Sequence, residues 1–222
     1  MSNWIPWLLP GTLLPTLAVQ QVFHMACWLV MLSWCTVAFL PVQDKRWRWL
    51  ASSVFWALVL SIWSWPLFML GMAFQTPALL TFCLCLGSAW RSVSSSSHRL
   101  FYSARPVPVS HWVWLVVSVL GGLLLLDTFG QVSVYAYGFD PALAWLGWLC
   151  ALCWLMLAYW FDLPAWHVHV AGSWLVATGL FVFTRAPSGN VWDAWLDPWL
   201  WLWAVFKLSR SWWRYRMRIS HS

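Results

Sequence analysis

The chain has 222 residues, of which 62% are hydrophobic and only 8% are charged, and its formal net charge is +6. Soluble domains carry about 25% charged residues, so a soluble fold of this composition would expose apolar patches large enough to aggregate. The composition therefore predicts an all-α integral membrane protein without a separate soluble domain. The basic residues lie at the ends of apolar segments, where they orient membrane proteins, so we do not expect nucleic acid as a partner.

The predicted elements begin with residues 1–20, an interfacial lead-in. Its prolines at Pro6, Pro10 and Pro15 are too closely spaced for a regular helix. A single transmembrane bundle is expected over residues 21–206, and its first span covers residues 22–40. The apolar stretch 49–90 is about twice as long as one span requires, so it must turn back once, either at residues 64–66 or at residues 75–77.

A polar segment rich in serine and arginine, at about residues 91–110, is predicted to be a cytoplasmic loop. Three further spans are expected over residues 111–126, 142–160 and 166–183. The last span, residues 192–206, contains tryptophans at three- and four-residue steps, which predicts that they lie along one side of one helix: Trp192, Trp195, Trp199 and Trp203. A basic cytoplasmic tail, residues 207–222, completes the chain.

Together these segments predict a bundle of about seven transmembrane helices, with the N-terminus outside and the C-terminus in the cytoplasm. This threading places eleven of the twelve basic residues on the cytoplasmic side and only Arg185 outside, as the positive-inside rule requires. A six-span bundle, in which residues 77–90 are re-entrant, is the alternative, and it would scatter the basic residues over both faces. The pattern favours a multi-pass protein of the bacterial inner (plasma) membrane.

Three histidines are expected near the cytoplasmic ends of spans: His111, His167 and His169. His167 and His169 are two residues apart, so they cannot face one site on a helix together. His111 paired with one of them would supply two axial imidazole ligands to a haem b, the one cofactor considered. The competing interpretation is that these histidines anchor helix ends at the interface, as do the tryptophans beside them.

The second candidate site is acidic and faces outside. Asp193 and Asp197 are four residues apart, so on one helix both carboxylates would face the same side. Asp127 and His24 are expected at the same surface, where carboxylates would attract cations or perform acid–base chemistry. The alternative interpretation is structural: Asp193 caps the last helix, and Asp197 with Pro198 forms its first turn.

No catalytic residue and no metal site can be assigned, because the chain lacks the G-x-S-x-G, H-E-x-x-H and Walker A motifs and contains no glutamate. The favoured hypothesis is therefore a non-enzymatic polytopic subunit that acts in the assembly of, or transport by, a larger inner-membrane complex. Its expected partners are the lipid bilayer and other membrane subunits. The alternatives are a haem- or quinone-binding redox subunit, and a small transporter or membrane enzyme with an acidic outer-face site.

Overall fold

A computed structural model describes residues 15–39, 45–62, 76–94 and 110–219. Within these ranges the chain forms eight α-helices, one short 3-10 helix and no strand, which confirms the all-helical prediction. The elements in chain order are α1 (Leu17–Phe39), α2 (Lys45–Ile62), α4 (Leu79–Ser94), α5 (His111–Thr128), η2 (Tyr135–Phe139), α6 (Pro141–Trp160), α7 (Ala165–Thr184), α8 (Val191–Trp195) and α9 (Pro198–Ile219).

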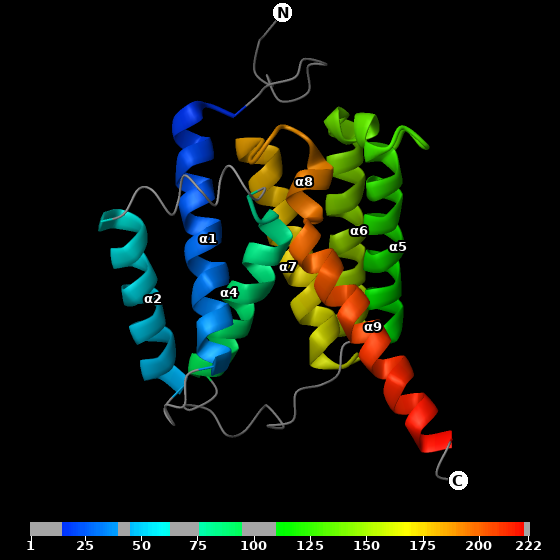
Figure 1. Cartoon of the computed structure of the whole chain (residues 1–222). Coiled ribbons are helices and arrows are strands. Elements are labelled where there is room, and N and C mark those ends of the chain that lie inside the picture. Colours follow the sequence, from blue (N-terminus) through cyan, green and yellow to red (C-terminus); the bar gives the residue numbers. More distant parts are fainter. Residues whose placement is uncertain (1–14, 40–44, 63–75, 95–109, 220–222) are drawn as a thin grey trace, which may run out of the picture.

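The long helices pack side by side, and most neighbours run in opposite directions (Figure 1). α1 contacts α2 and α4, α7 lies between α4 and α6, and α9 packs along α5. Buried apolar side chains from α4, α6, α7 and α8 meet in one cluster, whose members include Leu79, Ala144, Phe181 and Val191. The short helix α8 is therefore held inside the bundle and not on its surface.

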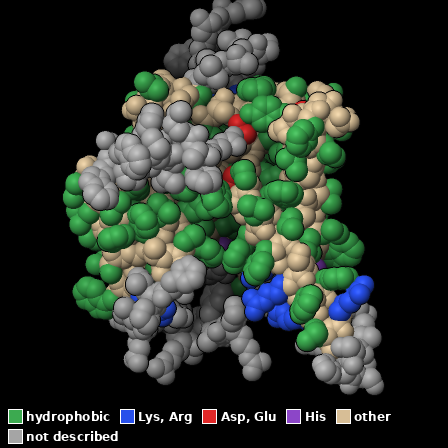
Figure 2. Space-filling view, in the orientation of Figure 1, with side chains coloured by type: hydrophobic (Ala, Val, Ile, Leu, Met, Phe, Trp, Pro, Cys, Tyr) green, Lys and Arg blue, Asp and Glu red, His purple; other side chains and the backbone are tan. Residues whose placement is uncertain are grey.

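Among the described residues, four helices are long and apolar enough to cross a membrane: α1 (over Leu17–Val37), α5, α6 and α7. The apolar part of α4, Leu79–Trp90, is shorter. Large hydrophobic side chains are exposed over the molecule, and Figure 2 shows them covering most of the visible face between the two ends of the bundle. Such a surface is suited to contact with lipid. The length, hydropathy and exposed surface of the helices are therefore those of a membrane protein.

Helix boundaries agree with the predictions where local signals are strong. α5, α6 and α7 coincide with the expected spans to within two residues at each end. Ser110 caps α5 by accepting from Trp112 N, and Asp140 caps α6 by accepting from Ala142 N ahead of Pro141. α1 begins at Leu17, so residues 17–20 are helical and do not belong to an irregular lead-in.

The two proposed turns in the stretch 49–90 fall between α2 and α4. Residues 75–77 lie immediately before α4, and residues 76–78 are not helical. The other proposed turn, residues 64–66, lies outside the described residues, as do residues 1–14 of the lead-in and most of the loop expected at 91–110.

The prediction of one continuous helix over residues 192–206 is wrong. α8 ends at Trp195, Leu196 has extended backbone angles, and α9 starts at Pro198. A proline has no N–H to continue a helix, and it disfavours helical angles in the residue before it, here Asp197. The four tryptophans therefore divide between two helices, Trp192 and Trp195 on α8 and Trp199 and Trp203 on α9. Trp199 and Trp203 contact α1 edge to face, at Trp28 and Trp34, whereas Trp195 contacts Trp174 of α7.

Three tryptophans of the α8–α9 segment pack against glycines of neighbouring elements. A Cβ atom added to any of these glycines would overlap the indole opposite it; the pairs are Trp192 with Gly138 of η2, Trp195 with Gly147 of α6, and Trp201 with Gly121 of α5. The indole of Trp201 is also held by a hydrogen bond of 3.1 Å from its Nε1 to the carbonyl of Ser118. Each indole ring thus occupies the space that a side chain would fill if the opposing residue were not glycine.

This packing predicts different effects of the same substitution at adjacent glycines. Gly121→Ala should lower the free energy of unfolding by about 1–3 kcal/mol, because its methyl group displaces the hydrogen-bonded indole of Trp201. Gly122→Ala is the matched control, since a Cβ there meets no atom within 4 Å, and alanine favours the helix by up to about 1 kcal/mol. The thermal midpoint in detergent is the measurement, and equal midpoints for both variants would contradict the packing.

Candidate functional site

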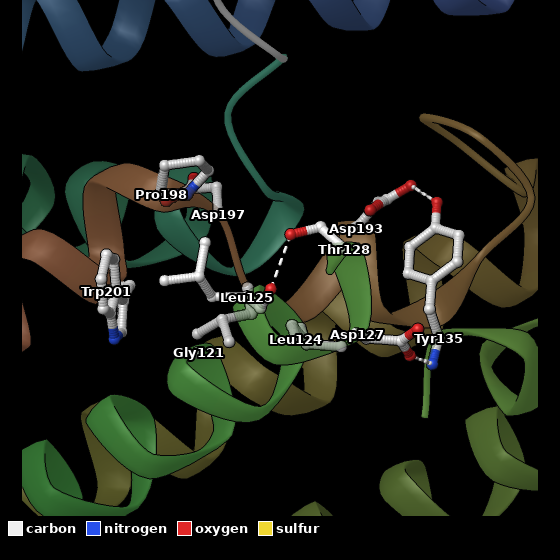
Figure 3. A pocket seen from close by; sticks show the side chains of 11 residues that line it. Gly121, Leu124, Leu125, Asp127, Thr128, Tyr135, Asp193, Asp197, Pro198 and Trp201 are labelled. Atoms are coloured by element: carbon white, nitrogen blue, oxygen red, sulfur yellow. Dashed lines mark hydrogen bonds between the residues drawn. The ribbon is translucent and has the colours of Figure 1, made fainter. Parts of the chain in front are cut away.

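A pocket of about 550 Å³ lies between α5, η2 and the α8–α9 segment (Figure 3). Most of its exposed lining surface is apolar. The apolar lining residues are Gly121, Leu124, Leu125, Leu196, Pro198 and Trp201, and the polar ones are Asp127, Thr128, Tyr135, Asp193 and Asp197. None of the described lining residues is a lysine, arginine or histidine. The pocket is therefore acidic as well as partly apolar.

Asp127 occupies the last turn of α5, where the helix dipole disfavours a negative charge. Its Oδ2 accepts hydrogen bonds from the backbone N–H groups of Val134, at 2.6 Å, and of Tyr135. These bonds fold the segment after α5 back over the helix end. The position of Asp127 is thus set by the loop that it closes.

Tyr135 links the end of α5 to α8. Its hydroxyl donates to Oδ2 of Asp193 at 2.7 Å, and Ser188 donates to the same oxygen. Burial, together with the hydrogen bond to Asp193 and the charge of that carboxylate, raises the pKa of Tyr135 to about 12. Tyr135 therefore remains a hydrogen-bond donor at physiological pH and fixes the Asp193 carboxylate at the pocket wall.

A buried amide completes this connection. Nδ2 of the fully buried Asn190 donates to the carbonyl of Tyr135 at 2.9 Å, and its Oδ1 accepts from Trp192 N at 2.9 Å. Asn190 thereby caps α8, and Asp193 lies in the first turn that follows. The prediction that Asp193 is the capping residue is wrong, because Asn190 precedes it by one turn and reaches the free N–H groups first.

Asp197 lies at the break between α8 and α9 and is only 4% exposed. Its Oδ1 accepts from Leu200 N at 2.6 Å, which caps α9, and its Oδ2 accepts from Ala78 N, also at 2.6 Å. The first bond agrees with the interpretation that Asp197 and Pro198 begin the last helix. The second bond joins the start of α4 to the start of α9. Asp197 therefore holds these two helix starts together in addition to lining the pocket.

The carboxylates of Asp127 and Asp193 each retain one oxygen for a ligand. In each case the described hydrogen bonds go to Oδ2, and Oδ1 accepts none from the described residues. Figure 3 shows both side chains beside Tyr135, whereas Asp197 and Trp201 lie at the opposite side of the pocket. The arrangement can accept hydrogen bonds from a cationic group and cover an attached apolar group.

Of the residues predicted for an outer-face site, the structure thus brings Asp127, Asp193 and Asp197 together around one pocket. It does so although the two later aspartates are not on one helix. His24 is not among the lining residues: its Nδ1 forms a 2.9 Å hydrogen bond with Oγ1 of Thr76, and its ring is 6.4 Å from that of Trp28.

The three histidines considered as haem ligands pack against three different helices. Nε2 of His111 is 3.4 Å from Ser211 Oγ of α9, and Nδ1 of His167 accepts from Trp154 Nε1 of α6 at 3.1 Å. The ring of His169 faces Gly87 of α4, whose missing side chain leaves room for it. Their placement gives no support to pairing His111 with His167 or His169, and it agrees with the interpretation that they anchor helix ends.

The pocket residues not identified from the sequence include Thr128, Tyr135 and Trp201. Tyr135 carried one usable signal, since it follows Asp127 within a short segment that has no basic residue. The sequence contains nothing to indicate that Gly121 packs against Trp201.

The bond between Tyr135 and Asp193 predicts a pH-dependent effect on stability. Tyr135→Phe should lower the free energy of unfolding at pH 7 by about 0.5–1.5 kcal/mol, the usual contribution of one hydrogen bond. Because the pKa is raised in the folded state, this contribution is complete below the ordinary value of 10.0 and is lost as the pH rises towards about 12. Thermal midpoints of the wild type and the variant should therefore converge above pH 10; a constant difference would contradict the assignment.

No protein-family model, curated protein or solved structure matches this chain. The function is therefore inferred from the chemistry and geometry of the pocket.

Proposed function

We propose that the protein is a small polytopic transporter whose outer pocket binds a cationic ligand with an apolar portion. The observation that carries this proposal is the convergence of Asp127, Asp193 and Asp197 on one pocket whose described lining contains no basic residue. Oδ1 of Asp127 and Oδ1 of Asp193 are the acceptors for the cationic group. Trp201 and the neighbouring leucines contact the apolar portion.

Two further features support this assignment. The pocket volume of about 550 Å³ falls within the usual range of about 300–1,000 Å³ for small-molecule sites. The pocket also lies at the break between α8 and α9, and interrupted membrane helices commonly build the substrate sites of transporters. The charge of Asp197 is offset by the N-terminus of α9 and two backbone N–H groups, so Asp193 and Asp127 supply most of the attraction.

We further propose a seven-span topology in a bacterial inner membrane, with the pocket facing outside and the end of α9 in the cytoplasm. The distribution of charge supports it. α9 carries its cations from Lys207 onward, and Figure 2 shows Lys and Arg at the end of the bundle opposite to the acidic atoms. α2 begins at the same end with Lys45, Arg46 and Arg48. Positive charge on one side is what sets the orientation of membrane proteins.

The other hypotheses rank below this one. A subunit of a larger assembly is compatible with the exposed aromatic side chains, but lipid accounts for the same exposure. Crosslinking in native membranes distinguishes the two, since only an assembly subunit yields a stoichiometric partner. A redox subunit would need two histidines aimed at one site, and His111 and His167 engage different helices.

The proposed site predicts charge-dependent ligand binding. The probe is 2-phenylethylammonium, and its neutral counterpart is 2-phenylethanol. Asp193→Asn keeps the hydrogen bonds from Tyr135 and Ser188 but removes the charge, so we expect the affinity for the cation to fall by roughly tenfold. Isothermal titration calorimetry of the purified protein in detergent measures the dissociation constants.

Asp140→Asn is the matched control, because it removes one carboxylate from the same end of the bundle but lies outside the pocket. Asparagine caps helices as well as aspartate does, so α6 is preserved. The control should bind the cation like the wild type. Equal losses in both variants, or equal affinity of the wild type for the cation and the neutral alcohol, would overturn the proposal.

The topology predicts opposite labelling of two exposed positions. In a variant whose six cysteines are replaced by serine, Gln131→Cys between α5 and η2 should react with a membrane-impermeant maleimide in intact cells. Ser209→Cys in α9 should react only after the membrane is opened. Labelling of both positions from the same side would exclude the seven-span arrangement.

A further inference from the structure

The last half of α9 is a helix that extends away from the bundle. Figure 1 shows its final turns projecting beyond the ends of the neighbouring helices. This segment has no acidic residue, so its positive charge is not compensated within the helix. Neighbouring cations on one helix repel each other weakly, and a partner of opposite charge would offset this repulsion.

The cations are arranged on one side of this helix. Lys207, Arg210 and Arg214 are separated by three and four residues, so they lie in one row along the helix surface. Arg210 and Arg214 are exposed, and Lys207 is partly covered because its Nζ lies 4.6 Å from the ring centroid of Trp203. The row continues the side of α9 on which Trp199 and Trp203 contact α1, so it starts where the apolar part of the helix ends.

Exposed indoles lie at the same level along α9 as this row, on other sides of the helix. Trp212 and Trp213 are 56% and 64% exposed, and the guanidinium carbon of Arg216 lies 4.3 Å from the ring centroid of Trp212. Tryptophan favours the depth of lipid headgroups, where its ring remains in an apolar layer and its N–H reaches polar groups. Exposed tryptophans at the same level along a helix as a row of cations are therefore suited to a membrane surface more than to an aqueous polyanion.

We propose that the row Lys207–Arg210–Arg214 binds the phosphate groups of anionic phospholipids in the leaflet at this end of the bundle, while Trp212 and Trp213 rest at headgroup depth. Arginine suits this task because its planar guanidinium donates two parallel hydrogen bonds to a phosphate. The site holds lipids of one charge class next to α9. It is independent of the acidic pocket at the opposite end.

The test titrates delipidated full-length protein in detergent with phosphatidylglycerol or phosphatidylcholine and counts the bound lipids by native mass spectrometry. The wild type should retain phosphatidylglycerol in preference to phosphatidylcholine. The double variant Arg210→Gln/Arg214→Gln should bind phosphatidylglycerol about tenfold more weakly, because each surface cation contributes to the attraction of an anionic headgroup. Both side chains are exposed, so folding should be unaffected, and an unchanged thermal midpoint checks this.

The matched control is Arg46→Gln/Arg48→Gln, which removes the same charge from α2 at the same end of the bundle. It should bind phosphatidylglycerol within about twofold of the wild type, and Arg210→Lys/Arg214→Lys should recover part of the affinity. If both glutamine variants lost the same affinity for phosphatidylglycerol, net charge alone would explain the binding, and the proposal would be overturned. Equal binding of the two lipids, or displacement of phosphatidylglycerol by a single-stranded DNA oligonucleotide at physiological salt, would also overturn it.

Discussion

The structure depends on one buried carboxylate, that of Asp197. Its two oxygens accept hydrogen bonds from backbone N–H groups that belong to α9 and to the segment before α4. A buried carboxylate is tolerated only when such bonds satisfy it, so the start of α9 and the start of α4 must stay together. The same residue precedes Pro198, where the helix is interrupted between α8 and α9. The break creates the space in which the pocket forms.

The packing of indoles against glycines positions the walls of that pocket. Trp201 lies in the space left by Gly121 on α5, and Trp192 does the same at Gly138 of η2. Because these glycines have no side chain, α5 and η2 approach the α8–α9 segment closely. The backbone around each glycine then packs directly against an indole and restricts its position. Asn190 and Tyr135 then join η2 to α8 through partly buried hydrogen bonds. Two carboxylates at the pocket wall, those of Asp127 and Asp193, are held by this framework and not by any cation among the described residues.

The two ends of the bundle differ in charge, and each proposal rests on a different end. At one end, acidic side chains converge on one pocket. At the other end, the cations of α9 form a row beside exposed indoles. A membrane protein with so few charged residues cannot place them at random, because a charge at bilayer depth is costly. Both proposals therefore concern the ends of the bundle, since these are the parts of the surface where charge is tolerated.

The sequence by itself determined the helical class, the apolar character and the limits of α5, α6 and α7. These depend on hydropathy and on caps such as Ser110 and Asp140, which act within one helical turn. The break at Asp197 and Pro198 also had a local signal, but the apolar periodicity that runs across it favoured a single helix. Only the tertiary structure decided that Tyr135 meets Asp193, 58 residues away, and that Trp201 meets Gly121. Such pairings depend on which helices become neighbours and on which of their faces are in contact. The packing of the whole bundle determines both, and a short stretch of sequence carries no information about that packing.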